Sequence, residues 1–214
     1  MTVCVSSAQT YEAGLMLGAS NYTGDIGSTN FVRPNDFAFG LIGKWNRSER
    51  HAFRASILFT EISGDDADAS DNSRKARGFE FENQLLEINI GLEYTFWEWE
   101  LYSGEPRATP YLYTGIVIVN RDELVRNAST DTRFQTDGSS WDFGIPMTIG
   151  FKFTLNRRMI MAIEGGARYT FTDGLDGSDQ TGFEFGNKDN NDWYFFTGIS
   201  LTYTFGKRPC YCNF

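Results

Sequence analysis

The stretch that decides the fold is LLEINIGLEYTFW, residues Leu85–Trp97. Its apolar residues recur at every second position from Leu86 to Phe96, and the positions between them hold mainly glutamate, asparagine, glycine and threonine. Successive side chains of a β-strand point to opposite faces, so this period predicts a strand with one apolar face and one polar face. An amphipathic helix would need a period near 3.6 residues, which this stretch lacks.

Seven further stretches share this alternation. Each is long enough to cross a membrane as a tilted strand, which takes about 9–11 residues. The stretch 111–119 is apolar on both faces, so its register stays open. Pro146 lies inside another stretch, and because proline cannot donate to the strand ladder we expect a β-bulge there. The predicted strands are 11–22, 37–45, 52–61, 85–97, 111–119, 141–155, 159–172 and 193–205.

The connections between these strands alternate in length. Long ones fall at 23–36, 62–83, 120–140 and 173–192, and shorter ones at 46–51, 98–110 and 156–158. This pattern predicts an all-β fold, an eight-stranded antiparallel up-and-down transmembrane β-barrel over residues 11–206. Residues 1–10 resemble the end of an export signal or a disordered N-terminus, and residues 207–214 form a short C-x-C tail. In an outer-membrane barrel of a Gram-negative bacterium the long loops are extracellular, and here the termini are periplasmic.

A soluble, lipocalin-like barrel has the same alternation, so a second signal must say which face meets water. The less apolar face holds mainly glycine, alanine, serine and threonine, which suits a narrow packed interior better than a solvated exterior. Aromatic residues lie near the strand ends, as in the girdles of membrane barrels. These residues are Tyr11, Tyr22, Trp45, Tyr94, Phe96, Trp97, Trp141, Trp193, Tyr203 and Phe205. We therefore predict a membrane barrel, surrounded by outer-membrane lipids.

The formal net charge of -9 disfavours a nucleic-acid surface, which needs clustered lysine and arginine. On the predicted topology the long loops are acidic, and the short turns and tail are mildly basic. Eight strands leave a lumen just wide enough for side chains to fill. We expect the inward charges to pair as an ion-pair core, with a path for protons or small solutes as the alternative. These residues are Glu12, Lys44, Arg54, Glu87, Glu93, Lys152, Glu164 and Arg168.

The chain shows no motif for catalysis, for a cofactor or for a metal. His51, its only histidine, lies in a short turn without a Ser–His–acid grouping, which favours a surface role. The acidic loops 63–68 and 173–179 do not match a calcium-binding frame, so we expect them to be solvated. The basic stretch Arg74–Arg77 either contacts lipopolysaccharide phosphates or balances the aspartates before it. We therefore predict that the protein is not an enzyme.

Several segments resemble PorG-type outer-membrane proteins, components of the type IX secretion system of Bacteroidota. They are YEAGLMLGASNYTGDIG (Tyr11–Gly27), parts of Lys44–Phe96, TPYLYTGIVI (Thr109–Ile118) and the closing LTYTFGKRPCYCNF. The most specific part is the ISGDD loop, followed by a basic-aromatic stretch and the LLEI strand. The resemblance covers most of the chain.

The resemblance implies a non-enzymatic anchor that ties the periplasmic ring of the PorK lipoprotein and PorN to the outer membrane. By the predicted topology, the contact face is the periplasmic rim with the 98–110 connection. Candidate contacts are Arg47, Glu49, Arg50, Arg157, Arg158, Lys207, Arg208, Cys210 and Cys212. The two cysteines either cross-link a partner or stay unpaired. The alternative function is a stand-alone small barrel, OmpX- or OmpW-like, for adhesion or small-solute passage.

Overall fold

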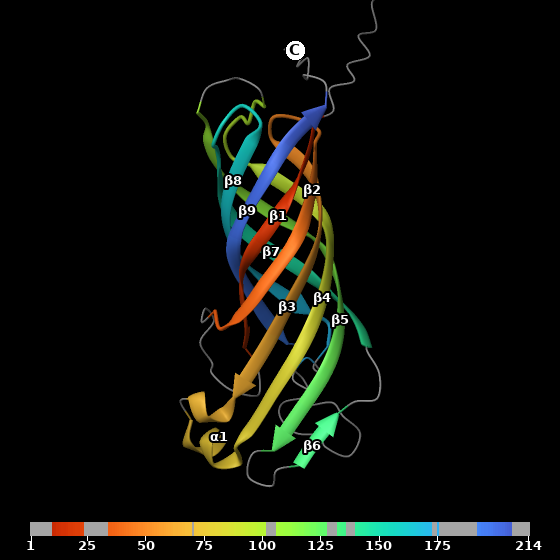
Figure 1. The fold of residues 1–214 in the computed structure, drawn as a ribbon, viewed down its shortest axis with the longest axis vertical. Coiled ribbons are helices and arrows are strands. Elements are labelled where there is room, and N and C mark those ends of the chain that lie inside the picture. Colours follow the sequence, from red (N-terminus) through yellow and green to blue (C-terminus); the bar gives the residue numbers. More distant parts are fainter. Residues whose placement is uncertain are drawn as a thin grey trace, which may run out of the picture.

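Eight antiparallel strands close into an up-and-down barrel in the computed structural model, as the alternation predicts (Figure 1). The structure describes residues 10–23, 34–69, 71–101, 106–127, 132–135, 140–172, 175 and 192–206. The barrel strands are β1 (Thr10–Thr23), β2 (Asp36–Asn46), β3 (His51–Asp65), β4 (Phe79–Thr95), β5 (Ala108–Asn127), β7 (Ser140–Thr154), β8 (Met159–Thr170) and β9 (Trp193–Gly206).

The first and last strands close the barrel. β1 pairs with β9 along its whole length, from Thr10 opposite Gly206 to Thr23 opposite Trp193. Each of the eight strands is thus paired on both sides over its barrel portion, which removes the exposed strand edges that promote aggregation. We call the end of the barrel with the turns 46–51 and 156–158 the short-turn end, and the opposite end the long-loop end.

Three strands run further than the sequence predicts, so parts of the expected loops 62–83 and 120–140 belong to these strands. β3, β4 and β5 project beyond the barrel at the long-loop end, together with three short elements (Figure 1). The apolar-outward alternation is lost there because the outward positions of β4 hold exposed polar residues such as Glu82 and Gln84, while the inward residues Phe81 and Leu85 are apolar and buried. The short elements are η1 (Asp66–Asp68), α1 (Asn72–Arg77) and β6 (Thr132–Gln135).

The expected β-bulge at Pro146 is absent, so that prediction is wrong. Thr114 pairs with Met147 and Val117 with Gly144, which leaves the same number of residues on both strands between the two pairs. Pro146 interrupts the pairing with β5 because it has no N–H to donate, but it inserts no extra residue.

Apolar side chains face outward and polar side chains face inward. Leu15 on β1 is 58% exposed and Ile90 on β4 is 64% exposed, whereas the inward neighbours Glu12 and Asn89 are buried. This distribution is the reverse of a soluble barrel and matches barrels that sit in lipid. Tyr22 departs from the predicted aromatic girdle because its side chain is buried inside the lumen. Within the described residues, no helix is both long and apolar enough to cross a membrane.

Candidate functional site

The interior of the barrel gathers its buried charges and is the candidate functional site. Eight ionisable side chains point inward because each lies at an inward position of its strand, and none is more than 4% exposed. They are the eight residues of the predicted core: Glu12, Lys44, Arg54, Glu87, Glu93, Lys152, Glu164 and Arg168. A buried charge without a partner costs several kcal/mol, so the arrangement of these groups decides whether the lumen can be dry.

Glu93 is the centre of the network nearest the short-turn end. The ammonium nitrogens of Lys44 and Lys152 each lie 2.7 Å from one of its carboxylate oxygens. A guanidinium nitrogen of Arg54 lies 4.0 Å from the carboxylate, at the limit of an ion pair. Glu93 on β4 thus joins cations from β2 and β7, which lie on opposite sides of the barrel, and from the adjacent strand β3.

Glu164 on β8 forms the next pair. Two guanidinium nitrogens of Arg54 each donate to one Glu164 oxygen at 2.7 Å, which is the bidentate geometry that arginine favours. The Tyr111 hydroxyl donates to the same carboxylate. Gly150 makes room for this ring, because a Cβ atom there would lie 2.3 Å from Tyr111 Cζ.

The remaining two acids are also satisfied. Glu12 accepts from the Asn46 amide at 2.8 Å and from the Thr202 hydroxyl at 2.7 Å. Glu87 lies 3.3 Å from an Arg168 guanidinium nitrogen and accepts from the Tyr194 hydroxyl at 2.6 Å. The inward charges are therefore tied into pairs and hydrogen bonds with one another and with tyrosine, asparagine and threonine side chains.

An apolar plug fills the lumen on the long-loop side of the charges. Its members are Tyr22, Ile62, Phe81, Leu85, Val117, Val119, Leu175 and Tyr194. Leu175 belongs to the connection 173–192, which the sequence predicts to lie outside the barrel. Its backbone N–H donates to Asp192 at 2.9 Å and its carbonyl accepts from Asn83 at 2.8 Å, while Tyr22 donates to Asp192 at 2.6 Å. Sequence reasoning missed this plug, because a single leucine in an acidic loop carries no periodic signal.

A second polar pair lies in this outer part of the lumen. Arg121 on β5 is buried, and its Nε lies 2.7 Å from an Asp142 carboxylate oxygen on β7. The strand predicted from the sequence ends at Val119, which leaves Arg121 in a loop. The stretch 111–119 is apolar on both faces, so its pattern does not show that Arg121 points inward.

The short-turn end of the lumen is also closed. Trp99, Leu101 and Ile160 form a buried apolar cluster, and the Trp99 backbone N–H donates to the Glu49 carbonyl at 2.9 Å. The Lys152 ammonium lies 4.9 Å from the centre of the Trp99 ring. Part of the connection expected to form a partner surface is thus folded over the barrel mouth, where it covers the charged layer.

The predicted contact residues at the short-turn rim differ in how far they are engaged. Arg47 and Arg157 are exposed, and Glu49 is half-buried. Arg50 donates to the Phe96 carbonyl at 2.7 Å and pairs with Glu98. Arg158 donates to the Tyr203 hydroxyl at 2.8 Å. The remaining predicted contacts, Lys207, Arg208, Cys210 and Cys212, lie outside the described residues.

His51 lies beside a serine but is not arranged for catalysis. The Ser48 hydroxyl is 3.2 Å from His51 Nδ1, and it also accepts from the backbone N–H groups of Arg50 and His51. Among the described residues no carboxylate hydrogen-bonds to the imidazole, so the third member of a triad is missing. The hydroxyl stabilises the turn. Among all the residues that the structure describes, no cluster of histidine, cysteine, aspartate and glutamate is suited to hold a metal ion.

Comparisons with known proteins bear on the fold. The family model described as "Domain of unknown function (DUF6089)" matches residues 1–214. Ail, the attachment invasion locus protein of Yersinia pestis, solved with the heparin analogue sucrose octasulfate, is similar with a TM-score of 0.50 and 8% identity over 92% of this chain and 99% of that one. A major outer membrane protein of Thermus thermophilus is similar with a TM-score of 0.50 and 11% identity over 92% and 100%. No curated protein matches the sequence.

Proposed function

The chain belongs to the family described as Domain of unknown function (DUF6089), and we propose that it is a non-enzymatic outer-membrane barrel that anchors a periplasmic assembly. The closed interior carries this proposal. Among the described residues, an ion-paired layer, an apolar plug and the Trp99 cluster follow one another along the lumen and fill its cross-section with side chains. The surfaces available for function are then the two rims and the outer wall.

The outward apolar belt supports the placement in the outer membrane of a Gram-negative bacterium. One solved structure of similar fold is a major outer membrane protein, and the girdle residues Trp97 and Trp141 are exposed near strand ends as interfacial aromatics are. With the long loops outside, as is usual for such barrels, the short-turn end faces the periplasm.

The finer proposal is a PorG-type component of the type IX secretion system that ties the PorK and PorN ring to the outer membrane. The resemblance of the segments Tyr11–Gly27 and Thr109–Ile118 supports it, as does the basic short-turn rim. Arg157 is exposed there, and arginine is enriched where proteins meet partners. Outer-membrane lipids and the ring proteins are the proposed partners.

Co-purification from native membranes tests this function. A tagged chain should recover the ring subunits, and deletion of its gene should abolish secretion of type IX cargo. Arg157→Glu should weaken ring recovery because it reverses a charge at the proposed contact. Lys75→Glu makes the same change on α1 at the opposite end and is the matched control. Normal secretion in the deletion strain would disprove the proposal.

A second candidate is a stand-alone adhesion barrel. It is favoured by α1, whose basic residues Arg74 and Lys75 lie on the part of the molecule that projects beyond the barrel (Figure 1). Ail was solved with a sulfated sugar, so sucrose octasulfate is a suitable probe. Binding that is lost in the Arg74→Gln, Lys75→Gln variant, together with intact secretion in the deletion strain, would favour adhesion. The closed interior disfavours the other alternative, solute passage.

A further inference from the structure

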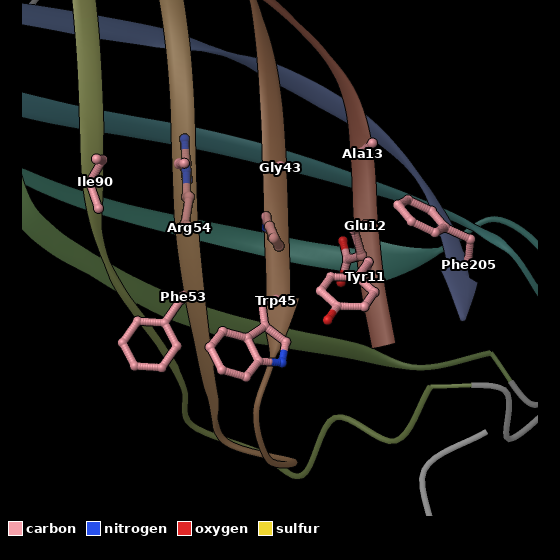
Figure 2. A pocket seen from close by; sticks show the side chains of 11 residues that line it. Tyr11, Glu12, Ala13, Gly43, Trp45, Phe53, Arg54, Ile90 and Phe205 are labelled. Atoms are coloured by element: carbon pink, nitrogen blue, oxygen red, sulfur yellow. The ribbon is translucent and has the colours of Figure 1, made fainter. Parts of the chain in front are cut away.

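A shallow groove of about 400 Å³ lies on the outer wall of the barrel near the short-turn end (Figure 2). Its floor is a row of small outward residues on adjacent strands, with Ala13 paired to Gly43 and Gly43 paired to Ala55. The row ends against Ile90 on β4. Strand neighbours lie about 4.8 Å apart, so the floor spans three strands and is wide enough for an extended hydrocarbon chain.

Larger side chains border the floor along both edges. Toward the short-turn end stand the aromatic rings of Phe53, Trp45, Tyr11 and Phe205 (Figure 2). The Trp45 and Phe53 ring centres are 5.4 Å apart, and those of Tyr11 and Phe205 are 5.9 Å apart. The other edge consists of exposed Leu15, Leu41 and Ile57, one outward position further along each strand.

Gly43 is responsible for the depth of the groove. A Cβ atom added there would meet only the Glu12 carbonyl oxygen, at 3.9 Å, so nothing else in the described protein fills the space above this backbone. Most other glycines of the barrel instead make room for a neighbouring strand or ring, as Gly150 does for Tyr111. The empty volume at Gly43 therefore opens outward, into the medium around the barrel.

Hydrocarbon is the occupant that this environment supplies. In the proposed membrane location the groove opens into the lipid belt. A water molecule there would lose hydrogen bonds. A protein segment there would need to form a helix or a closed sheet, because its backbone N–H and C=O groups must be hydrogen-bonded. Strands of such barrels tilt by about 35–45°, so a row across the strands runs obliquely to the membrane and a lipid chain can lie along it.

Arg47 provides a partner for a lipid phosphate beside the groove. It follows β2 in the turn immediately beyond Trp45 and Asn46, and its side chain is exposed. Within the described part of the chain Arg47 forms no ion pair, whereas its neighbour Arg50 is already engaged with Glu98. A guanidinium binds a phosphate through two parallel N–H donors, so an exposed arginine at the membrane interface complements an anionic headgroup.

We propose that this groove is a specific binding site for one phosphate-bearing glycerolipid of the surrounding leaflet. One acyl chain lies over Ala13, Gly43 and Ala55 against the aromatic edge, and the phosphate binds Arg47. The inference rests on the proposed membrane location, and it adds to the proposed anchor a fixed lipid on the β1–β3 side of the barrel.

Native mass spectrometry of the full chain in detergent, titrated with phosphatidylglycerol, tests the acyl-chain part. The wild type should retain one lipid after others are stripped. Gly43→Leu fills the groove and should abolish that retention. Gly165→Leu is the matched control: Gly165 also faces outward, on β8, and the atom nearest to an added Cβ lies 3.7 Å away. Equal retention in both variants would overturn the site.

The headgroup part is tested with Arg47→Gln. Its affinity for phosphatidylglycerol should fall about tenfold, which corresponds to the loss of one charge-assisted contact of about 1.4 kcal/mol. Arg157→Gln removes the same charge at the same rim, away from the groove, and should bind as the wild type does. Diacylglycerol with the same chains should bind the wild type more weakly and should not respond to Arg47→Gln. Equal binding of the two lipids would overturn the phosphate contact.

The same variants separate this inference from the proposed function. If Gly43→Leu keeps the lipid but loses the ring subunits during co-purification, the groove docks a protein and the lipid proposal is wrong. If Gly43→Leu loses the lipid while the deletion strain secretes normally, the lipid site stands and the secretion role is wrong.

Discussion

At the scale of single residues, Glu93 is the inward acid that contacts the most buried cations. It holds the ammonium groups of Lys44 and Lys152 at 2.7 Å each, with all three side chains almost completely buried. Glu93→Gln leaves both cations without a carboxylate, and breaking a buried pair costs about 3–5 kcal/mol. We therefore expect the free energy of unfolding to fall by about that amount, measured by urea titration in detergent micelles.

The matched control for this substitution is Glu98→Gln. Glu98 pairs with Arg50 at 3.3 Å, but the two side chains are 63% and 42% exposed. Exposed pairs contribute about 0–1 kcal/mol, so this change should leave the unfolding midpoint nearly unmoved. Similar losses in the two variants would show that the interior pairs do not stabilise the barrel.

Glu61 has a pKa near neutrality. It follows Phe59, the last outward apolar residue of β3, and so lies beyond the lipid belt. A hydrogen bond with Glu82, followed by partial burial and repulsion from Glu82 and Asp36, raises the pKa of Glu61 from 4.5 to about 7. The folded protein therefore binds this proton more tightly than the unfolded chain does. The resulting stabilisation is full below pH 4.5 and is lost as pH rises through 7.

Carboxyl-carbon NMR of labelled glutamate checks this pKa. Glu61 should titrate near pH 7 in the wild type, and Glu82→Gln should lower its pKa because the amide donates a hydrogen bond to the charged form and carries no charge. Titration of Glu61 in the ordinary carboxyl range, or no response to Glu82→Gln, would refute the pairing.

At the scale of elements, the sequence is informative wherever lipid touches one face of a strand. Leu86, Ile88 and Ile90 alternate with inward polar residues because one side meets hydrocarbon and the other meets the lumen. The pattern of apolar outward and polar inward residues ends where the outer face of a strand meets water, as at Glu82 and Gln84, which is why the outer part of β4 was predicted as a loop. The inward direction of the acids and bases was predictable from their place in the alternation, but which acid pairs with which base was not.

Tyrosine shows the limit of this reasoning most clearly. Tyr22, Tyr111 and Tyr194 lie at inward positions and donate to Asp192, Glu164 and Glu87 respectively. A tyrosine near a strand end looks the same in sequence whether its hydroxyl meets headgroups or a buried carboxylate. Which one it meets depends on partners from distant strands, and a single sequence contains no record of those contacts.

The connection between β4 and β5 acts as a cover over the short-turn mouth. Trp99 lies against Lys152, so Trp99→Ala should admit water to this ammonium. We expect Lys152 to become reactive toward a small acylating reagent, mapped by mass spectrometry. Trp97→Ala is the control, because Trp97 is 57% exposed and does not cover the lumen. An unreactive Lys152 in the Trp99→Ala variant would mean that the deeper layers alone exclude water.

At the scale of the whole molecule, the lumen is closed three times in series, by chemically different means. The Trp99 cluster excludes water by apolar packing, the central layer fills the lumen with cross-wall ion pairs, and the plug around Leu175 adds a second apolar layer. Three successive layers favour a rigid barrel over a gated one, because opening a path through the lumen requires all three layers to rearrange together. A rigid barrel suits an anchor, whose task is to hold a position in the membrane.

From these three layers we expect the barrel not to conduct ions. The wild-type chain in a planar bilayer should show no single-channel steps, because the lumen of eight strands is just wide enough for side chains to fill and these three layers fill it. Trp99→Ala should also fail to conduct: removing the cover leaves the pairs of Glu93 and Glu164 and the plug in place. A large porin in the same bilayer is the positive control for incorporation and recording. Discrete steps from the wild type would contradict the closed lumen and favour solute passage, whereas steps from Trp99→Ala alone would show that the tryptophan is the only effective barrier.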